Sequence, residues 1–324
     1  MAAKSEALRR DVGTIRQLEA GQVDDETWKM FKKRHGWIAS LARAKSEAEK
    51  QDITRQATGT AMVLIGGTML GMCVVLGGMV MLILAILRWR GGKLRLALRR
   101  NSGGDGGVLL EGFALYLALF LVVPSLMHHL WAGLPSWVIY AVLSSTLLVG
   151  MAWPRWRGMP GETWREALGL HRGQGWLREI GAGLGGWLAS TPLLVAGMMA
   201  ASWITKMTGQ FPYHPIIDVF AGDIWAKLGA ILLAAVWAPV SEELMFRGLL
   251  FPGLSAWVRW IPGTLAGAFV FAAIHPQGWA GVPAIMALAI TFSVLRMWRR
   301  SVIAPMAAHA LNNGLMCVLM LLLW

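Results

Sequence analysis

Residues 238–247 of the 324-residue chain read APVSEELMFR, and the charged residues in this stretch constrain the fold. It places two adjacent carboxylates, Glu242 and Glu243, inside a run that is otherwise apolar. A carboxylate at the centre of a membrane-spanning helix costs at least about 2.5 kcal/mol on insertion scales. Both residues therefore need a partner or a function.

The spacing of this segment separates the two glutamates. Glu243 and Arg247 are four residues apart with the acid first, which is the favourable order for an ion pair on one helix face. Glu242 points about 100° away and has no such partner in its own helix. Pro239 predicts a kink just before the pair. We infer that Arg247 neutralises Glu243 and that Glu242 is left for chemistry; the alternative is a helix end that surfaces with an ordinary surface ion pair.

The composition indicates that most of the chain lies in a lipid membrane. Hydrophobic residues make up 56% of the chain and charged residues 15%, whereas soluble domains carry about 25% charged residues. The net charge is +12, but the basic residues mostly flank apolar runs. This distribution follows the positive-inside rule of membrane proteins and argues against a nucleic-acid partner. The sequence predicts an all-α polytopic integral membrane protein.

The apolar runs give the number of spans. A helix crosses the hydrocarbon core with about 20 residues, so the runs predict about seven or eight transmembrane helices. The runs at 263–275 and 283–295 are too short to cross alone and predict short helices inside a bundle or beside a wet cavity. The runs cover 59–87, 108–130, 137–153, 180–203, 228–246, 263–275, 283–295 and 302–323.

Three regions follow from these runs. Residues 1–57 hold 12 of the 30 Lys and Arg and 9 of the 18 Asp and Glu, and predict a short soluble helical arm. Residues 58–107 contain the first transmembrane segment and a basic loop, and residues 108–324 contain the core. The basic connections at 88–100 and 154–179 are expected on the cytoplasmic side. A single crossing by the first run would then place the basic arm outside.

Two further segments carry polar groups on apolar helices. His275 closes the run 269–276, FVFAAIHP, with Phe271 one turn earlier on the same face. His309 and Asn313 are four residues apart in the last run and share a face. Taken singly, His275 fits a helix cap or interface residue, and His309 with Asn313 fits interhelical hydrogen bonding.

Together the segments supply a carboxylate, two imidazoles and an amide. This combination provides a base for activating water and donors for an oxyanion, which are the needs of peptide-bond hydrolysis. The sequence contains neither HExxH nor GxxxxGK[ST], and no serine with a convincing base.

The order EExxxR, FxxxH, HxxxN in consecutive hydrophobic segments resembles the CPBP family of intramembrane proteases. These proteins, also called Abi or CAAX-protease-like, are relatives of the CAAX prenyl endopeptidase Rce1. The motif region spans about 228–321 within the core 108–324, and the arm and first span lie outside the resemblance. The family includes prenyl-protein proteases, bacteriocin-related immunity or maturation factors, and membrane scaffolds.

The resemblance implies a role for each matching residue. Glu242 falls on the glutamate base and His275 on the histidine that orients water. His309 and Asn313 fall on the pair that supports the oxyanion. Glu243 and Arg247 fall on the structural ion pair, and Phe271 packs the site.

Metal dependence is a separate expectation. Two histidines and one glutamate could hold Zn²⁺, but the helical partner of His309 is Asn313, a poor zinc ligand. The sequence therefore favours a site without metal or other cofactor.

These observations predict an intramembrane glutamic-type endopeptidase in the cytoplasmic membrane of a prokaryote. Its partners would be the lipid bilayer and a membrane-anchored or CAAX-like protein substrate, cleaved by water that Glu242 activates. One alternative is a non-catalytic scaffold or immunity factor that binds a partner in the same cavity. Another is a transporter or channel, since intramembrane Glu and His also build proton relays. The clustering of ionisable residues in three C-terminal motifs argues against a relay through the whole membrane.

Overall fold

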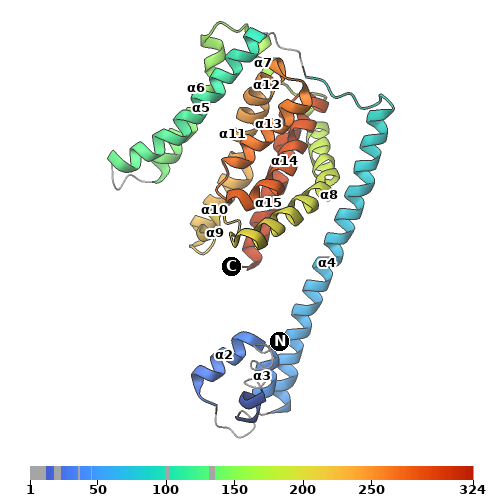
Figure 1. The fold of residues 1–324 in the computed structure, drawn as a ribbon, viewed down its shortest axis with the longest axis vertical. Coiled ribbons are helices and arrows are strands. Elements are labelled where there is room, and N and C mark those ends of the chain that lie inside the picture. Colours follow the sequence, from blue (N-terminus) through green and yellow to red (C-terminus); the bar gives the residue numbers. More distant parts are fainter. Residues whose placement is uncertain are drawn as a thin grey trace. The chain divides into compact units, whose positions relative to one another are not determined.

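The computed structural model describes residues 12–17, 23–35, 37–44, 46–98, 103–130 and 136–323. These ranges contain helices and no β-strand, which confirms the all-α class (Figure 1). The chain divides into two compact units, residues 1–73 and 74–324. The helices before the membrane core are α2 (Asp25–His35), α3 (Trp37–Arg43) and α4 (Glu47–Arg90).

The first unit contains α2, α3 and the beginning of α4. Asp24 caps α2, because its carboxylate accepts the backbone N–H groups of Glu26 and Thr27. The hydroxyl and backbone N–H of Thr27 lower the pKa of Asp24 below its ordinary value. Arg43 of α3 lies over the Trp28 ring of α2, 4.7 Å from its centroid. This cation–π contact joins the two short helices.

Helix α4 is continuous across the predicted boundary between arm and first span. Its 44 residues correspond to about 66 Å at 1.5 Å per residue, far more than the hydrocarbon core requires. The charged residues lie within its first nine residues and in its last turn, and the apolar run lies between them. The division into an arm (residues 1–57), a first span with a basic loop (58–107) and a core (108–324) stays a prediction.

The second unit continues with α5 (Gly103–Leu130), α6 (Ser136–Trp156), α7 (Gly161–Leu168), α8 (Trp176–Thr208) and α9 (Ile216–Val219). A continuous helical stretch follows: α10 (Ile224–Leu232), η1 (Leu233–Trp237), α11 (Ala238–Glu243), η2 (Leu244–Leu250) and α12 (Phe251–Trp257). The chain ends with α13 (Trp260–Ala273), α14 (Gly278–Arg299) and α15 (Ile303–Leu323).

Six helical stretches in the described part of the chain are long and apolar enough to cross a membrane, and α13 is a shorter apolar helix. One expectation is wrong. The run at 283–295 was predicted to be too short to cross, but α14 extends it to 22 residues. The extension is possible because Pro283 lies near the N-terminal end, where few intrahelical bonds are lost, and because the basic residues near Arg299 stay helical.

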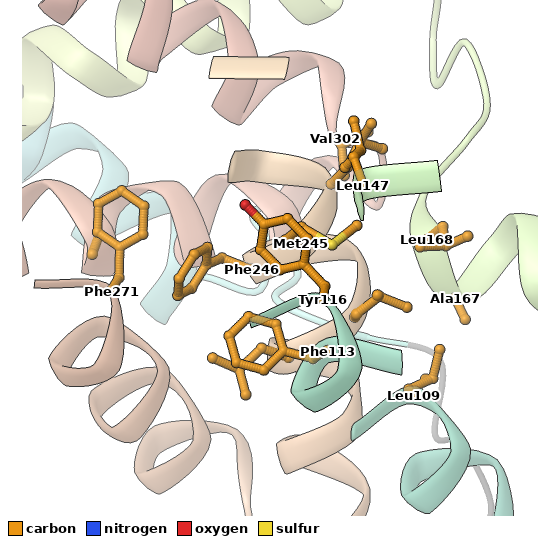
Figure 2. Close-up of a cluster of buried hydrophobic side chains, with 14 of the residues drawn as sticks. Leu109, Phe113, Tyr116, Leu147, Ala167, Leu168, Met245, Phe246, Phe271 and Val302 are labelled. Carbon is orange, nitrogen blue, oxygen red and sulfur yellow. The ribbon is translucent and has the colours of Figure 1, made fainter. Parts of the chain in front are cut away.

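Helix α14 is the centre of the C-terminal bundle and packs against α8, α13 and α15. The α5–α6 hairpin packs on α12 and η2 through one large apolar cluster (Figure 2). Within this cluster Phe246 contacts the rings of Phe113 and Phe271 edge-on, at centroid separations of 5.1 and 4.8 Å. The segment that carries the two glutamates is therefore held between the hairpin and the bundle.

A buried carboxylate ties α8 to α14. Glu179, in the first turn of α8, is fully buried and receives two hydrogen bonds from Arg299, 2.7 and 3.0 Å long. The backbone N–H of Gln174 donates a third. A bidentate Arg–carboxylate pair fixes geometry as well as charge, so it sets the register of these two helices.

Helices α8 and α15 approach closely at Gly183. A Cβ atom added there would lie 2.4 Å from the carbonyl oxygen of Ala304 and 2.8 Å from the Cβ of Ala307. Gly181, two residues earlier in the same helix, has no such neighbour within 4 Å. The contact at Gly183 positions the beginning of α15, the helix that carries two of the candidate site residues.

This pair of glycines gives a matched test. We expect Gly183→Ala to lower stability by about 1–3 kcal/mol, because overpacking a close contact forces the helices apart. Gly181→Ala should be neutral or stabilising by about 0.5–1 kcal/mol, because alanine is the better helix former. Melting temperatures of both variants in one detergent check the difference, and equal values would contradict the close approach.

Candidate active site

The helix that carries the glutamates departs from the α-helical hydrogen-bond register twice. Two π-helical segments, η1 and η2, flank the six-residue helix α11, and Pro239 lies at its start. Such segments are rare and are often found at functional sites. The π-helical segment η1 ends two residues before Pro239, where the sequence predicts a kink.

Pro239 leaves one backbone acceptor without its partner. In η1 the N–H of Ala238 donates to Leu233, five residues back. The same register would pair the carbonyl of Ala234 with the nitrogen of Pro239, which has no hydrogen. Asn313 fills this position, since its side-chain amide donates to the Ala234 oxygen at 2.8 Å. The bond fixes α15 against η1.

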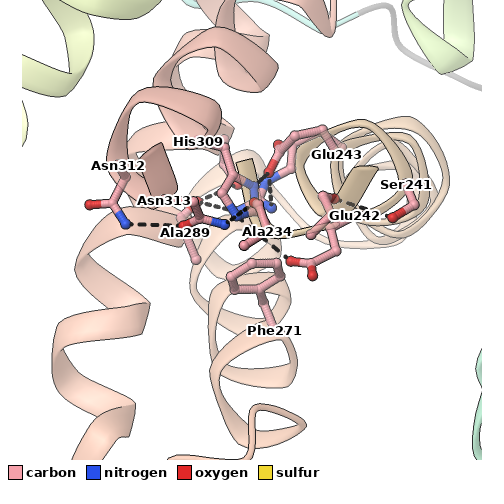
Figure 3. A network of polar contacts seen from close by, with 12 residues as sticks. Ala234, Ser241, Glu242, Glu243, Phe271, Ala289, His309, Asn312 and Asn313 are labelled. Atoms are coloured by element: carbon pink, nitrogen blue, oxygen red, sulfur yellow. Dashed lines mark hydrogen bonds and ion pairs between the residues drawn. The ribbon is translucent and has the colours of Figure 1, made fainter. Parts of the chain in front are cut away.

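Glu243 is fully buried and accepts two bonds at one oxygen. Its Oε1 lies 3.0 Å from Arg247 Nη1 and 2.9 Å from His309 Nδ1 (Figure 3). Its Oε2 has no hydrogen-bond partner. The carboxylate therefore joins η2 to α15 and orients the imidazole.

Arg247 is also buried, with 2% of its side chain exposed. Besides Glu243 it donates to the carbonyl of Ala289 at 2.8 Å. Its guanidinium lies over the rings of Phe271 and Phe292, 4.7 and 5.1 Å from their centroids. Cation–π contacts of this kind offset part of the cost of burying the charge.

Glu242 faces the two imidazoles and is the more accessible glutamate, with 26% of its side chain exposed. Its Oε2 lies 3.8 Å from the Nε2 atoms of both His275 and His309. This oxygen has no hydrogen-bond partner. Both separations exceed the 2.7–3.2 Å of a direct hydrogen bond. A water oxygen placed between the three groups would be within hydrogen-bond reach of them.

The orientation of both rings is fixed from the opposite side. His275 Nδ1 donates to the carbonyl of Phe271 at 2.5 Å, and His309 Nδ1 donates to Glu243. Phe292 stacks on the His309 ring with centroids 4.9 Å apart. With Nδ1 used as donor in both rings, each Nε2 presents a lone pair toward Glu242 in the neutral form.

The structure thus brings Glu242, Glu243, Arg247, His275 and His309 together from four separate segments, with Phe271 packed against both imidazoles. Asn313 lies one turn beyond His309 on α15. Its hydrogen bonds are to Ala234 and Asn312, and none joins it to the glutamates in the described part of the chain.

Sequence analysis missed Arg296, which is fully buried at the end of α14. Its guanidinium donates to the carbonyls of Ala167 and Arg247, at 2.8 and 3.2 Å, and also to those of Glu166 and Arg300. Gly169 has φ +70° and passes so close that a Cβ would lie 2.9 Å from Arg296. In the sequence this arginine resembles any basic residue at a helix end.

His214 is a second residue that the motifs did not indicate. It lies half-buried in the connection between α8 and α9, and its Nδ1 accepts the backbone N–H of Ile216 at 3.1 Å. Burial lowers the pKa of His214, and the charge that His275 carries when protonated lowers it further. This connection therefore approaches the edge of the site.

Comparison with known proteins gives one result. Residues 224–315 match the family model described as type II CAAX prenyl endopeptidase, Rce1-like. No curated protein and no solved structure matches the chain at a significant level. The match confirms the resemblance inferred from the three motifs, and the protein is an integral membrane protein with an Rce1-like region.

The buried ion pair gives a stability test. Glu243→Gln leaves Arg247 without a carboxylate, and breaking a buried pair costs about 3–5 kcal/mol. Arg247→Leu should have a similar effect, since it leaves the Glu243 charge unpaired. The double variant should recover part of the loss.

Melting temperatures of the four proteins in one detergent measure the coupling. Glu111→Gln is a matched control, because Glu111 pairs with Arg157 at 2.9 Å in an exposed position, where pairs contribute about 0–1 kcal/mol. Additive losses in the double variant would contradict the pairing.

Proposed function

We propose that the protein is an intramembrane glutamic-type endopeptidase that cleaves a membrane-associated or CAAX-like protein substrate. The observation that carries the proposal is the position of Glu242 Oε2. This carboxylate oxygen is buried and has no hydrogen-bond partner, belongs to a side chain that is 26% exposed, and lies 3.8 Å from two oriented imidazole nitrogens. The match of residues 224–315 to a family of endopeptidases supports the same reaction class.

In the proposed reaction Glu242 takes a proton from a water molecule that also donates to Nε2 of His275. The resulting hydroxide attacks the carbonyl carbon of the scissile peptide bond. Glu242 then delivers the proton to the leaving nitrogen as the C–N bond breaks. General acid–base catalysis of this kind contributes about 10²–10⁴-fold to the rate.

The tetrahedral oxyanion is assigned to His309 and Asn313. His309 already donates Nδ1–H to Glu243, so the role requires a proton on Nε2 as well. Asn313 uses one amide hydrogen on Ala234 and retains a second for the oxyanion.

The location proposed for this reaction is the cytoplasmic membrane of a prokaryote, with the basic connections on the cytoplasmic side. The charge asymmetry of the connections supports this orientation. A peptide substrate would enter as the end of a membrane-anchored chain.

We expect Glu242→Gln to lower single-turnover cleavage by at least 10²-fold, because it keeps the shape of the side chain and removes the base. The assay uses purified protein in lipid with a quenched CAAX-type peptide and a panel of membrane peptides. Glu111→Gln, an exposed change on α5 outside the described site, is the control and should leave the rate unchanged.

Substrate affinity and melting temperature are measured in parallel for both variants. A Glu242→Gln protein that is folded, binds peptide and does not cleave supports a catalytic base. Retention of most activity would contradict it. If no peptide is cleaved by the unmodified protein, the binding-only scaffold becomes the better function.

We further propose that the reaction needs no metal. The described residues contain no cluster of His, Cys, Asp and Glu side chains with the geometry of a metal site. The residue one turn beyond His309 is Asn313, whose amide is a poor zinc ligand and donates to the carbonyl of Ala234.

Activity should therefore survive EDTA and phenanthroline, with a zinc peptidase in the same detergent as the positive control for chelation. Metal analysis of the purified protein accompanies the assay. Stoichiometric zinc, with activity lost on stripping and restored on addition, would replace this proposal with metal-assisted hydrolysis.

A further inference from the structure

A cavity lies beside the short helix α7, and neither Glu242 nor Glu243 lines it. It has a volume of about 1070 Å³, at the upper end of the roughly 300–1,000 Å³ of typical small-molecule sites. None of the candidate site residues lines it. Its charged lining consists of four arginines, Arg155, Arg165, Arg296 and Arg300, against two glutamates, Glu162 and Glu166.

The floor of this cavity is formed by Arg296, which several hydrogen bonds hold in place. Arg296 is buried and held by carbonyls from the last turn of α7 and from Arg247. Arginine is favourable at a helix C-terminus, where unpaired carbonyls carry partial negative charge. The hydrogen bonds of this guanidinium go to carbonyl oxygens, and it forms no ion pair with a carboxylate among the described residues.

The rim of the cavity is positive and accessible. Arg165 of α7 and Arg300 after α14 are exposed and have no ion pair within the described part of the chain. Trp164 and Leu170 add apolar surface beside them. Guanidinium groups over an apolar wall suit an anion that carries an apolar portion.

The position of the cavity indicates the membrane–water interface. It lies at the end of the bundle where α14 ends and where the connection before α8 begins. Trp156, at the end of α6, and Trp176, at the beginning of α8, lie before and after α7 in the sequence, and both side chains are exposed. Tryptophan is enriched at the level of lipid headgroups, so we expect the cavity to lie at the depth of the lipid phosphates.

We propose that this cavity binds a phosphate anion, as the headgroup of an anionic phospholipid or as free phosphate, between Arg165 and Arg300 above Arg296. Bidentate hydrogen bonding from arginine matches phosphate oxygens. Because Arg296 also bonds to the backbone of Arg247, an occupant stabilises the segment that carries the glutamates. The site does not depend on the proposed peptidase activity.

The test uses the full chain in a neutral detergent. Melting temperature and native mass spectrometry are recorded with short-chain phosphatidylglycerol, with phosphatidylcholine and with inorganic phosphate. The pocket variant is Arg165→Gln with Arg300→Gln. The control is Arg172→Gln with Arg178→Gln, which removes the same charge from two exposed arginines outside the cavity lining.

We expect phosphatidylglycerol to raise the melting temperature and phosphatidylcholine to have little effect. The pocket variant should bind phosphatidylglycerol on the order of 30-fold more weakly, about fivefold for each basic side chain that meets an anionic lipid. The control variant should bind like the unmodified protein. An equal response to inorganic phosphate would identify the free anion as a sufficient ligand.

Two results would overturn the proposal: unchanged phosphatidylglycerol binding in the pocket variant, or an equal loss in both variants, which indicates a diffuse basic surface. If the double pocket variant does not fold, Arg165→Gln alone is compared with Arg172→Gln. Arg165 is exposed on α7 and accepts this change without loss of a buried contact.

Discussion

The burial of Glu243 is the constraint on which the rest of the site depends. A carboxylate with no exposed surface inside an apolar bundle is stable only with a cation and further hydrogen bonds around it. Arg247 supplies the charge from four residues along the same helix, and His309 supplies a second donor from α15. Arg247 in turn needs acceptors and finds Ala289 of α14 and two aromatic rings. One buried charge therefore fixes three helices relative to one another.

The fixed network orients groups that it does not itself include. His309 is held at Nδ1 by Glu243, so its Nε2 has to face Glu242. His275 is held in the same way by the carbonyl of Phe271 at the end of the short helix α13. The length of α13 matters here, because the helix ends at Ala273 and His275, two residues later, lies 3.8 Å from Glu242. Preorganisation of this kind is what catalysis by positioned groups requires.

A hydrogen bond to the backbone of η1 is a second connection between this helix and α15. Pro239 removes the donor that the π-helical register would offer to Ala234, and Asn313 replaces it from α15. The side-chain amide of Asn313, on the same helix face as His309, thus forms a hydrogen bond with the backbone of the segment that carries Glu242. At the other end of that segment the carbonyl of Arg247 accepts from Arg296, which forms the floor of the basic cavity. The glutamate segment is therefore held by side chains at both ends.

Sequence alone determined the membrane class, the three motifs and the pairing of Glu243 with Arg247, because these depend on composition and on spacing within one helix. The resemblance to CAAX-type endopeptidases came from the same local patterns, which a family match over residues 224–315 confirms. Local spacing did not show that α14 extends to 22 residues, since a proline near a helix start lowers the apparent length of the run.

Tertiary structure decided which groups meet. The two 3.8 Å separations at Glu242 join α11 to residues 33 and 67 positions further along the chain, and no periodicity specifies such distances. The burial of Arg296 and Glu179 was equally hidden, because a charged residue at a helix end has the same sequence pattern whether it faces water or a neighbouring helix. Sequence fixes the chemistry that each helix carries; packing between helices fixes which charges lose their water and therefore which ones need each other.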